Sequence, residues 1–157
     1  MSLPTSSHAY GIGIIAVIVG LAIGISYYQL YFIPESNAKP IIPEKVRNPG
    51  QSINIAIVTG SSNQDQKDNF FPKKQPVLLG VNNLVVWANN DIVAHFVTID
   101  PKSNYNDHYS GPLDSPAIMP GKTFSFLFTQ EGTVNYYCKV HPWMTGEIDV
   151  VHGALTS

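Results

Sequence analysis

The sequence predicts an all-β sandwich or barrel that follows one N-terminal membrane-spanning helix. The first observation behind this prediction is that no charged side chain occurs from Met1 to Phe32 and that the run from Ala9 to Ile25 is apolar. The second is a series of short β-branched and aromatic runs from Gln51 onward, separated by Gly, Pro and Asn. A chain of 157 residues has room for one ordinary domain and an appendage.

Residues 1–33 are predicted to be a transmembrane anchor. The run from Ala9 to Ile33 is apolar on every side, and as a helix it would be about 37 Å long, enough to cross a bilayer with some tilt. Tyr27, Tyr28 and Tyr31 lie near its end, where aromatic rings favour the headgroup level. A cleaved secretory signal is the alternative, but no Lys or Arg precedes the run and no clear cleavage site follows it.

Residues 34–50 are predicted to be a proline-rich tether. Pro34, Pro40, Pro43 and Pro49 can neither continue the helix nor enter a central strand. A semi-rigid linker of this kind keeps a domain at a distance from the membrane surface and lets the domain change its position above that surface.

Residues 51–152 are predicted to be the β domain, and residues 153–157 a tail. We expect about seven or eight strands. The candidates are Ile53 to Thr59, Gln75 to Val81, Leu84 to Ala88, His95 to Asp100, Thr123 to Thr129, Val134 to Cys138 and Gly146 to Val151.

Two kinds of feature in this domain are expected to be structural. Phe124, Phe126 and Phe128 alternate along one candidate strand, so they are expected to face the core together with Trp87. The long connection 101–120 is expected to be a solvated loop, with a cover over a metal face as the alternative.

Charge and cysteine content narrow the function. The formal net charge of −2 gives no basic stripe for phosphate binding, so nucleic acid is not an expected partner. The only cysteine, Cys138, cannot form an internal disulfide. It is a buried hydrophobe, a reactive thiol or a metal ligand, and its neighbours favour the last.

A thiolate, an imidazole and a thioether follow one another at Cys138, His141 and Met144. His95, at the start of another strand, is the expected fourth donor. One thiolate, two imidazoles and a weak axial thioether match a mononuclear type 1 copper site, whereas zinc normally takes four good donors. A thiol-protease site explains the pattern less well, because it leaves Met144 without a role.

From about Ile53 to Val151 the chain resembles the cupredoxin family, and the pattern Cys138-x-x-His141-x-x-Met144 is similar to its plastocyanin, amicyanin and halocyanin-like members, here of a membrane-anchored archaeal type. The other matching segments are Phe71-Pro72, Val85-x-Trp87-x-Asn89-x-Asp91-x-x-x-His95 and Pro120-Gly121-Lys122-Thr123-Phe124.

This resemblance implies a Greek-key β-sandwich, often described as a barrel, that holds one copper and carries single electrons between membrane-associated redox complexes. The chain is then no enzyme. The implied partners are redox proteins such as a cytochrome complex, an oxidase or another copper protein. Relatives work outside the cytoplasm, so we expect the copper domain on the extracytoplasmic side. The basic residues Lys39, Lys45 and Arg47 after the helix argue for the opposite orientation.

Further residues are expected around the copper. By resemblance, Pro142 and Trp143 form an apolar docking patch at the edge of His141. Phe96 is expected beside the metal, and Asn89 or Asn90 is expected to tie the His95 strand to the Cys138 loop.

Two other functions stay open at this point. One is a copper enzyme that acts on a small nitrogen oxide at an open axial position. The other is a fixed electron-transfer subunit of a membrane oxidase or cytochrome complex. Copper storage is a weaker alternative, because it would predict more Met or His donors than one compact set.

Overall fold

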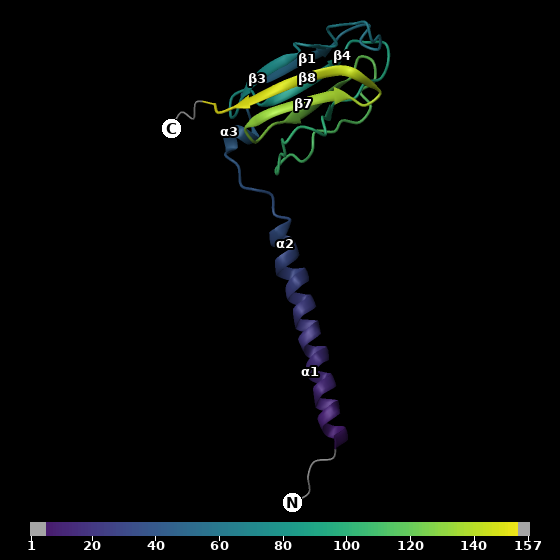
Figure 1. Ribbon diagram of the computed structural model, residues 1–157. Coiled ribbons are helices and arrows are strands. Elements are labelled where there is room, and N and C mark those ends of the chain that lie inside the picture. Colours follow the sequence, from purple (N-terminus) through teal and green to yellow (C-terminus); the bar gives the residue numbers. More distant parts are fainter. Residues whose placement is uncertain (1–5, 154–157) are drawn as a thin grey trace, which may run out of the picture. The chain divides into compact units, whose positions relative to one another are not determined.

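The computed structural model describes residues 6–153 of the chain. It divides into two compact units, Met1–Lys39 and Pro40–Ser157. The first is helical and the second is rich in strands (Figure 1).

The helical unit is one long apolar helix. It comprises α1 (Ser6–Tyr27), the π-helical turn η1 (Tyr28–Phe32) and α2 (Ile33–Ser36). In the π turn the N–H of Ile33 donates to the carbonyl of Tyr28, directly before Pro34, which has no N–H to donate. The helix thus passes Pro34 and ends at Ser36, three residues beyond the predicted end of the anchor.

This helix is long and apolar enough to cross a membrane. The candidate span is Tyr10–Ser36, with a mean hydropathy of 2.1 and no part of its most apolar window buried. A signal sequence near an N-terminus has the same properties.

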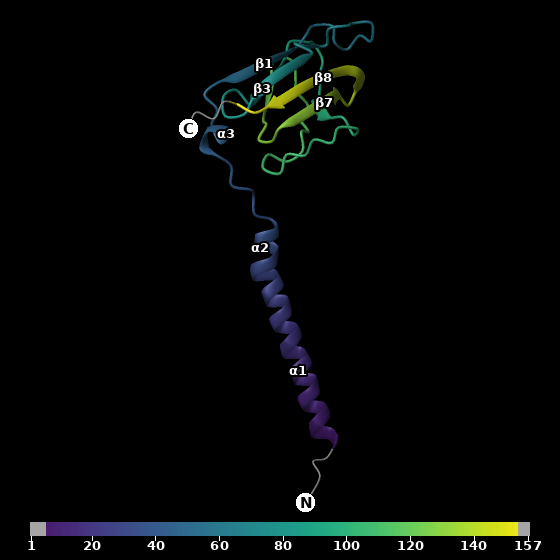
Figure 2. The same cartoon turned by 60° about the vertical axis from the view of Figure 1, so that its left-hand side comes forward.

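Over the described residues, the second unit holds eight strands in two four-stranded sheets. Figure 2 shows this unit from a second side. One sheet has the order β2-β1-β4-β6 and the other β3-β8-β7-β5. The strands are β1 (Ser52–Ile57), β2 (Phe70–Phe71), β3 (Lys74–Leu78), β4 (Leu84–Asn89), β5 (Thr98–Ile99), β6 (Thr123–Leu127), β7 (Gly132–Cys138) and β8 (His141–Val151). The predicted all-β architecture is confirmed.

Strand direction brings several strand ends to one end of this unit. β1 and β4 are parallel, so Ile57 and Asn89 finish side by side. In the other sheet β7 and β8 are antiparallel, and Cys138 at the end of β7 pairs with His141 at the start of β8. These connections carry most of the predicted site residues.

The predicted strand from His95 to Asp100 is shorter than expected. β5 contains only Thr98 and Ile99, because the residues before it pair with the second half of the 101–120 connection. His95 forms a bridge with Ile118, and the N–H of Ile99 donates to the carbonyl of Leu113. Residues 113–118 of this connection are therefore hydrogen-bonded to the chain around His95 and do not form a free loop.

The core contains the aromatic side chains that the alternation predicted. Trp87, Phe128 and Tyr136 are almost completely buried, Phe126 is 8% exposed, and Phe124 packs against this cluster from its edge. The Trp87 ring lies 5.5 Å from the Tyr136 ring in an edge-on contact. Such a packed interior resists small displacements of the strands that pass through it.

The last part of the predicted tether belongs to the strand-rich unit. The short helix α3 (Glu44–Arg47) has Val46 only 5% exposed, and the side-chain amide of Asn83 donates to the carbonyls of Val46 and Phe128 at 2.9 and 2.6 Å. Asn83 directly precedes β4, so α3 packs at the end of the unit opposite Asn89 and the metal-ligand candidates. Residues 44–47 thus pack on the strand-rich unit and are not part of a free spacer.

Candidate metal centre

Cys138 and His141 are positioned by the tight turn between β7 and β8. Tyr137 pairs with Thr145, whereas the next residue, Cys138, pairs with His141. Residues 142–144 are therefore extra on the β8 side and form a bulge, a device that re-aims side chains next to functional sites. Met144, the last residue of this bulge, is fully buried.

His95 reaches the same place from the connection between β4 and β5. It follows the turn after β4, and its N–H and carbonyl exchange hydrogen bonds with Ile118 at 3.1 and 2.8 Å. Its side chain is fully buried. This backbone pairing leaves little freedom for the imidazole.

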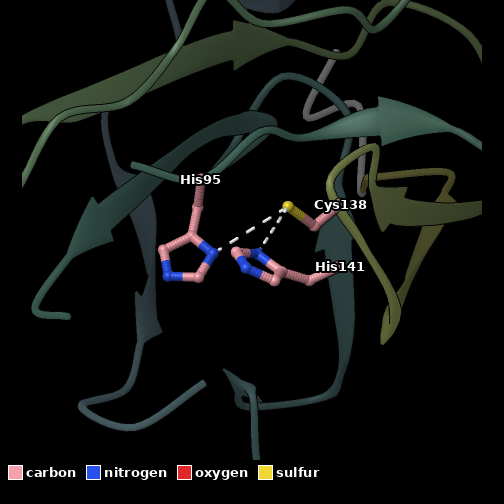
Figure 3. A group of neighbouring side chains, drawn as sticks. All are labelled: His95, Cys138 and His141. Atoms are coloured by element: carbon pink, nitrogen blue, oxygen red, sulfur yellow. Dashed lines mark hydrogen bonds between the residues drawn. The ribbon is translucent and has the colours of Figure 1, made fainter. Parts of the chain in front are cut away.

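The three side chains converge. Sγ of Cys138 lies 3.9 Å from Nδ1 of His95 and 3.6 Å from Nδ1 of His141, and Figure 3 shows both rings turned toward the sulfur. One ligand atom from each of the three residues lies within 4.8 Å of the other two. Bonds of about 2.0 Å to nitrogen and about 2.3 Å to sulfur, at tetrahedral or trigonal angles, separate the sulfur from each nitrogen by about 3.5–3.7 Å. The spacing thus fits one metal ion bound by all three.

Comparison with known proteins decides the family. Residues 56–151 match the model of the plastocyanin/azurin family of copper binding proteins. The chain belongs to this family.

Curated relatives agree with this assignment. Amicyanin-alpha from Methylorubrum extorquens is 29% identical over 80 residues, which cover 47% of this chain and 59% of the relative. Amicyanin from Paracoccus denitrificans is 28% identical over 76 residues, which cover 45% of this chain and 50% of the relative. The matched part thus spans only about half the length of these relatives.

A solved structure extends the likeness to the fold. A novel purple cupredoxin from Nitrosopumilus maritimus is 28% identical, with a TM-score of 0.52, and the match covers 63% of this chain and 99% of that one. The chain thus has the cupredoxin fold, and His95, Cys138, His141 and Met144 form its candidate type 1 copper site.

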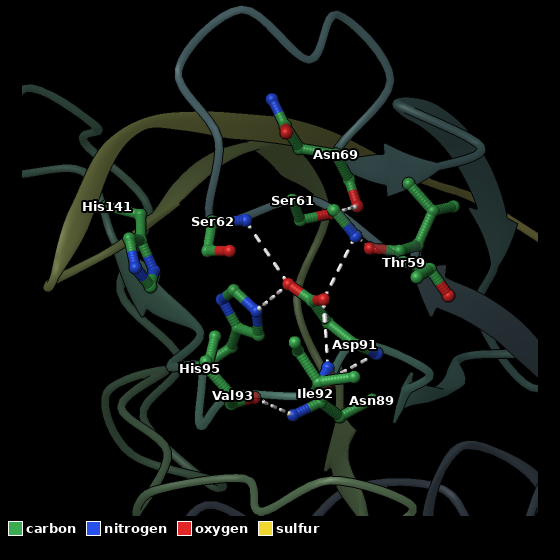
Figure 4. Close-up of polar contacts among 12 residues, drawn as sticks. Thr59, Ser61, Ser62, Asn69, Asn89, Asp91, Ile92, Val93, His95 and His141 are labelled. Atoms are coloured by element: carbon green, nitrogen blue, oxygen red, sulfur yellow. Dashed lines mark hydrogen bonds and ion pairs between the residues drawn. The ribbon is translucent and has the colours of Figure 1, made fainter.

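The carboxylate of Asp91 contacts the ring nitrogen of His95 that does not face Cys138. Oδ2 of Asp91 lies 2.9 Å from Nε2 of His95, and Asp91 also accepts the N–H groups of Gly60, Ser62 and Ile92 (Figure 4). Burial raises the pKa of Asp91, but these hydrogen bonds outweigh it and lower the pKa to about 2. An ionised carboxylate can only accept, so Nε2 carries the proton and Nδ1 keeps its lone pair for a metal.

Sequence reasoning gave Asp91 no role. The signal that could have found it is its position four residues before the expected ligand, in a turn where a short acidic side chain can reach the imidazole.

The surroundings of Cys138 favour the thiolate form of its sulfur. The backbone N–H of Phe96 donates to it over 3.3 Å. Burial raises the pKa of Cys138, but hydrogen bonds from His95 and from the N–H groups of Phe96, Val140 and His141 outweigh it and lower the pKa below its ordinary value. The thiolate is the form that binds metals. Phe96 thus contributes through its backbone, while its half-buried ring packs against the core.

The pKa values of the two histidines shift in opposite directions. Burial lowers the pKa of His95, but Cys138 and Asp91 raise it above its ordinary value. Burial and the neighbouring His95 lower the pKa of His141. A metal ion therefore competes with a proton more strongly at His95 than at His141.

The hydrogen bonds of Asn89 and Asn90 differ from the expectation. The side-chain amide of Asn89 donates to the carbonyls of Val93 and Ile118, at 2.8 and 2.7 Å. Asn90 is exposed, and its carbonyl accepts the hydroxyl of Thr59. Among the contacts of residues 6–153, none joins either Asn to the Cys138 loop, because Asn89 instead closes the turn that carries His95.

The predicted docking residues have different surroundings. Pro142 is exposed. Trp143 is half-buried, and its indole N–H donates to the carbonyl of Ser61 over 3.2 Å. Its ring lies 5.2 Å from the ring of His141. Trp143 is thus held in the structure rather than free on the surface.

The 101–120 connection is anchored at two points. Asp107 is buried and accepts hydrogen bonds from Tyr105, Tyr109, Ser110 and Thr129. Asp114 forms an ion pair of 2.6 Å with Lys139, in the turn between Cys138 and His141. The connection thus supports the ligand loop from outside.

His108 and His152 are expected not to bind a metal. His108 is exposed, and His152 pairs with Glu131 at 2.7 Å. The side chain of His8 lies outside the described residues. Within the described part of the chain, His95, Cys138 and His141 are the one group of this kind that could hold a metal ion.

Proposed function

We propose that this chain is a membrane-anchored cupredoxin of the archaeal type that carries single electrons through one type 1 copper, bound by His95, Cys138, His141 and Met144. The observation behind the proposal is the convergence of one cysteine sulfur and two imidazoles from the β4–β5 connection and the β7–β8 hairpin, with one ligand atom of each within 4.8 Å of the others. Copper bound by such donors supplies a one-electron Cu(I)/Cu(II) couple.

The residues of the chain keep the site rigid and dry. Cys138, His95 and Met144 are fully buried, so water is excluded from most of the centre. Their backbones are fixed by the β7–β8 pairing and by the bridge between His95 and Ile118. Fixed donors reduce the rearrangement that accompanies a change of oxidation state, which favours rapid electron exchange.

Electrons would pass at the partly exposed edge of His141. Exposed apolar side chains neighbour the site in the chain: Ile92 follows Asp91, Met119 follows Ile118, and Val140 precedes His141. Their exposed fractions are 81%, 54% and 54%. We name Ile92, Met119, Val140 and the exposed Pro142 the apolar rim. A patch of this kind suits brief contact with a redox protein.

We further propose that Tyr10–Ser36 stays in the chain as the anchor, with the copper domain on the extracytoplasmic side. Its uniformly exposed apolar surface supports this assignment. Alkaline extraction should leave the full chain in the membrane fraction, and protease added outside intact cells should release the domain. Release by alkali, or protection from external protease in intact cells with cleavage after lysis, would contradict the assignment.

The electron-carrier proposal is tested by the full chain in detergent, loaded with copper. Reduced protein mixed with an oxidised small soluble cytochrome should be reoxidised in a second-order reaction, and the Cys138→Ser variant should not react in this way. Copper that binds but does not exchange electrons would contradict the proposal. Turnover of added nitrite or nitric oxide would instead favour the enzyme alternative.

A further inference from the structure

The turn Gly60–Ser62, between β1 and β2, contacts the supports of both histidine ligands. On one side, the N–H of Gly60 donates to Oδ1 of Asp91 at 2.9 Å and the N–H of Ser62 donates to Oδ2 at 3.2 Å. The same Oδ2 lies 2.9 Å from Nε2 of His95. Two backbone amides of this turn therefore hold the carboxylate that orients His95.

The other side of the turn holds Trp143. The carbonyl of Ser61, between those two amides, accepts the indole N–H of Trp143 at 3.2 Å. The Trp143 ring lies 5.2 Å from the ring of His141, with 59° between their planes. The orientation of His141 is thus restricted by a ring that the same turn holds.

The turn is itself fixed. Ser61 is fully buried, and its hydroxyl contacts the carbonyls of Val58 and Asn69 at 2.6 and 3.0 Å. Its N–H donates to the carbonyl of Val58 at 3.2 Å. A turn whose polar groups are paired in this way moves as one piece, because a partial movement would leave several groups unpaired.

We propose that Gly60–Ser62 is a clamp that positions His95 and His141 together, through Asp91 on one side and Trp143 on the other. This deepens the electron-carrier function, on which it rests for the role of the histidines as ligands. Asp91 and Trp143 are positioning residues in it. Loosening either contact then loosens the other, although Asp91 lies in the connection after β4 and Trp143 lies in β8.

Independent supports would behave differently. If Asp91 orients His95 alone and Trp143 merely fills space beside His141, a change at one would leave the hydrogen bond of the other intact. The difference is measurable without copper, because the relevant N–H groups exchange with solvent.

The first measurement uses the unaltered metal-free chain in detergent. Hydrogen exchange of the Gly60 and Ser62 amides and of the Trp143 indole N–H should show protection factors within about tenfold of one another, since one opening exposes all three. An indole that exchanges far more rapidly than the two amides would overturn the clamp. This experiment needs no variant that might misfold.

The second measurement uses matched substitutions in the same chain. Trp143→Phe keeps an aromatic ring, although a smaller one, and removes the indole N–H, and it should speed exchange of the Gly60 and Ser62 amides about tenfold. Asp91→Asn should likewise speed exchange of the Trp143 indole. Asp65→Asn removes a carboxylate from the exposed part of the same connection and should change none of these rates. Unchanged rates in both clamp variants would overturn the proposal.

The copper-loaded chain gives a separate test. The clamp predicts that the changes in the copper EPR parameters caused by Asp91→Asn and Trp143→Phe are non-additive in the double variant. Additive changes would contradict a single clamp. If the unaltered chain shows no thiolate-to-copper band, the electron-carrier proposal fails, whereas the exchange results still decide whether the turn links the two side chains.

Discussion

Asp91 and His95 form a buried pair in which Oδ2 of the carboxylate lies 2.9 Å from Nε2 of the imidazole. The two side chains are 1% and 0% exposed. This contact fixes which nitrogen of His95 is free, because the proton on Nε2 leaves the lone pair on Nδ1, the atom that faces Cys138. It also places a full negative charge directly behind a proposed copper ligand.

Asp91→Asn should raise the reduction potential of the copper. A negative charge close to the metal favours Cu(II) over Cu(I), so its removal favours the reduced state. We expect an increase on the order of 60 mV, which corresponds to about a tenfold change in a one-electron equilibrium. Voltammetry of the copper-loaded chain measures it. Asp65→Asn is the control of equal charge change, and an equal shift in both variants would show that net charge alone is responsible.

Asp107→Asn should destabilise the fold without changing the copper spectrum. Asp107 accepts backbone N–H groups from Tyr109, Ser110 and Thr129, and an amide nitrogen in place of one oxygen would face these donors. The free energy of unfolding of the metal-free chain should fall by about 2 kcal/mol at neutral pH. Chemical denaturation measures it, with exposed Asp68→Asn as the control.

The same carboxylate predicts a pH dependence. Burial raises the pKa of Asp107, but its hydrogen bonds outweigh this and lower the pKa below its ordinary value of 3.8. A lowered folded-state pKa contributes stability that is present above pH 3.8 and is lost as the pH falls through the folded pKa. The difference between the unaltered chain and Asp107→Asn should therefore shrink below about pH 4. A difference that stays constant to pH 2 would contradict this role.

Gly146→Ala should weaken the core beneath the site. An added Cβ would lie 2.3 Å from Cζ and from the hydroxyl oxygen of Tyr136, which is almost completely buried against Trp87. We expect a loss of about 3 kcal/mol, visible as a lower melting temperature. Gly50→Ala is the matched control, because nothing lies within 4 Å of its added Cβ. Equal melting temperatures for the two variants would refute the packing argument.

Val140→Asp should slow electron exchange and leave the copper spectrum intact. Val140 belongs to the apolar rim and is 54% exposed, whereas Trp143 is bonded to Ser61 and is a poorer probe of docking. A charge in the rim must be desolvated on contact, so we expect the second-order rate constant to fall about tenfold. Stopped-flow absorbance measures it. Ile41→Asp, at a fully exposed residue before α3, is the control and should have no effect.

Local spacing predicted most of the candidate centre. Cys138, His141 and Met144 lie in one hairpin, so a strand and a tight turn suffice to bring the thiolate and its neighbouring imidazole together. His95 was predictable because it follows a strand with a regular apolar pattern. The cupredoxin fold was likewise predictable, since its strands are short, alternating and separated by Gly, Pro and Asn.

The parts that sequence reasoning missed depend on contacts between distant segments. Asp91 is held by Gly60 and Ser62, 31 and 29 residues earlier, and no local pattern reports such contacts. The two-residue strand β2 is too short for an alternation. The strand after His95 is truncated because the 113–118 segment takes its hydrogen bonds. Val46 is buried in the strand-rich unit, although the residues around it were predicted to be a linker.

The central claim is the thiolate–copper bond, and the visible absorption and EPR spectra of the copper-loaded chain test it most directly. The unaltered protein should show an intense thiolate-to-copper absorption band at about 600 nm, or at a shifted wavelength if the site is distorted. The Cys138→Ser variant should lose that band completely. A colourless protein that takes up zinc in preference, or a band that survives the substitution, would contradict the proposed centre.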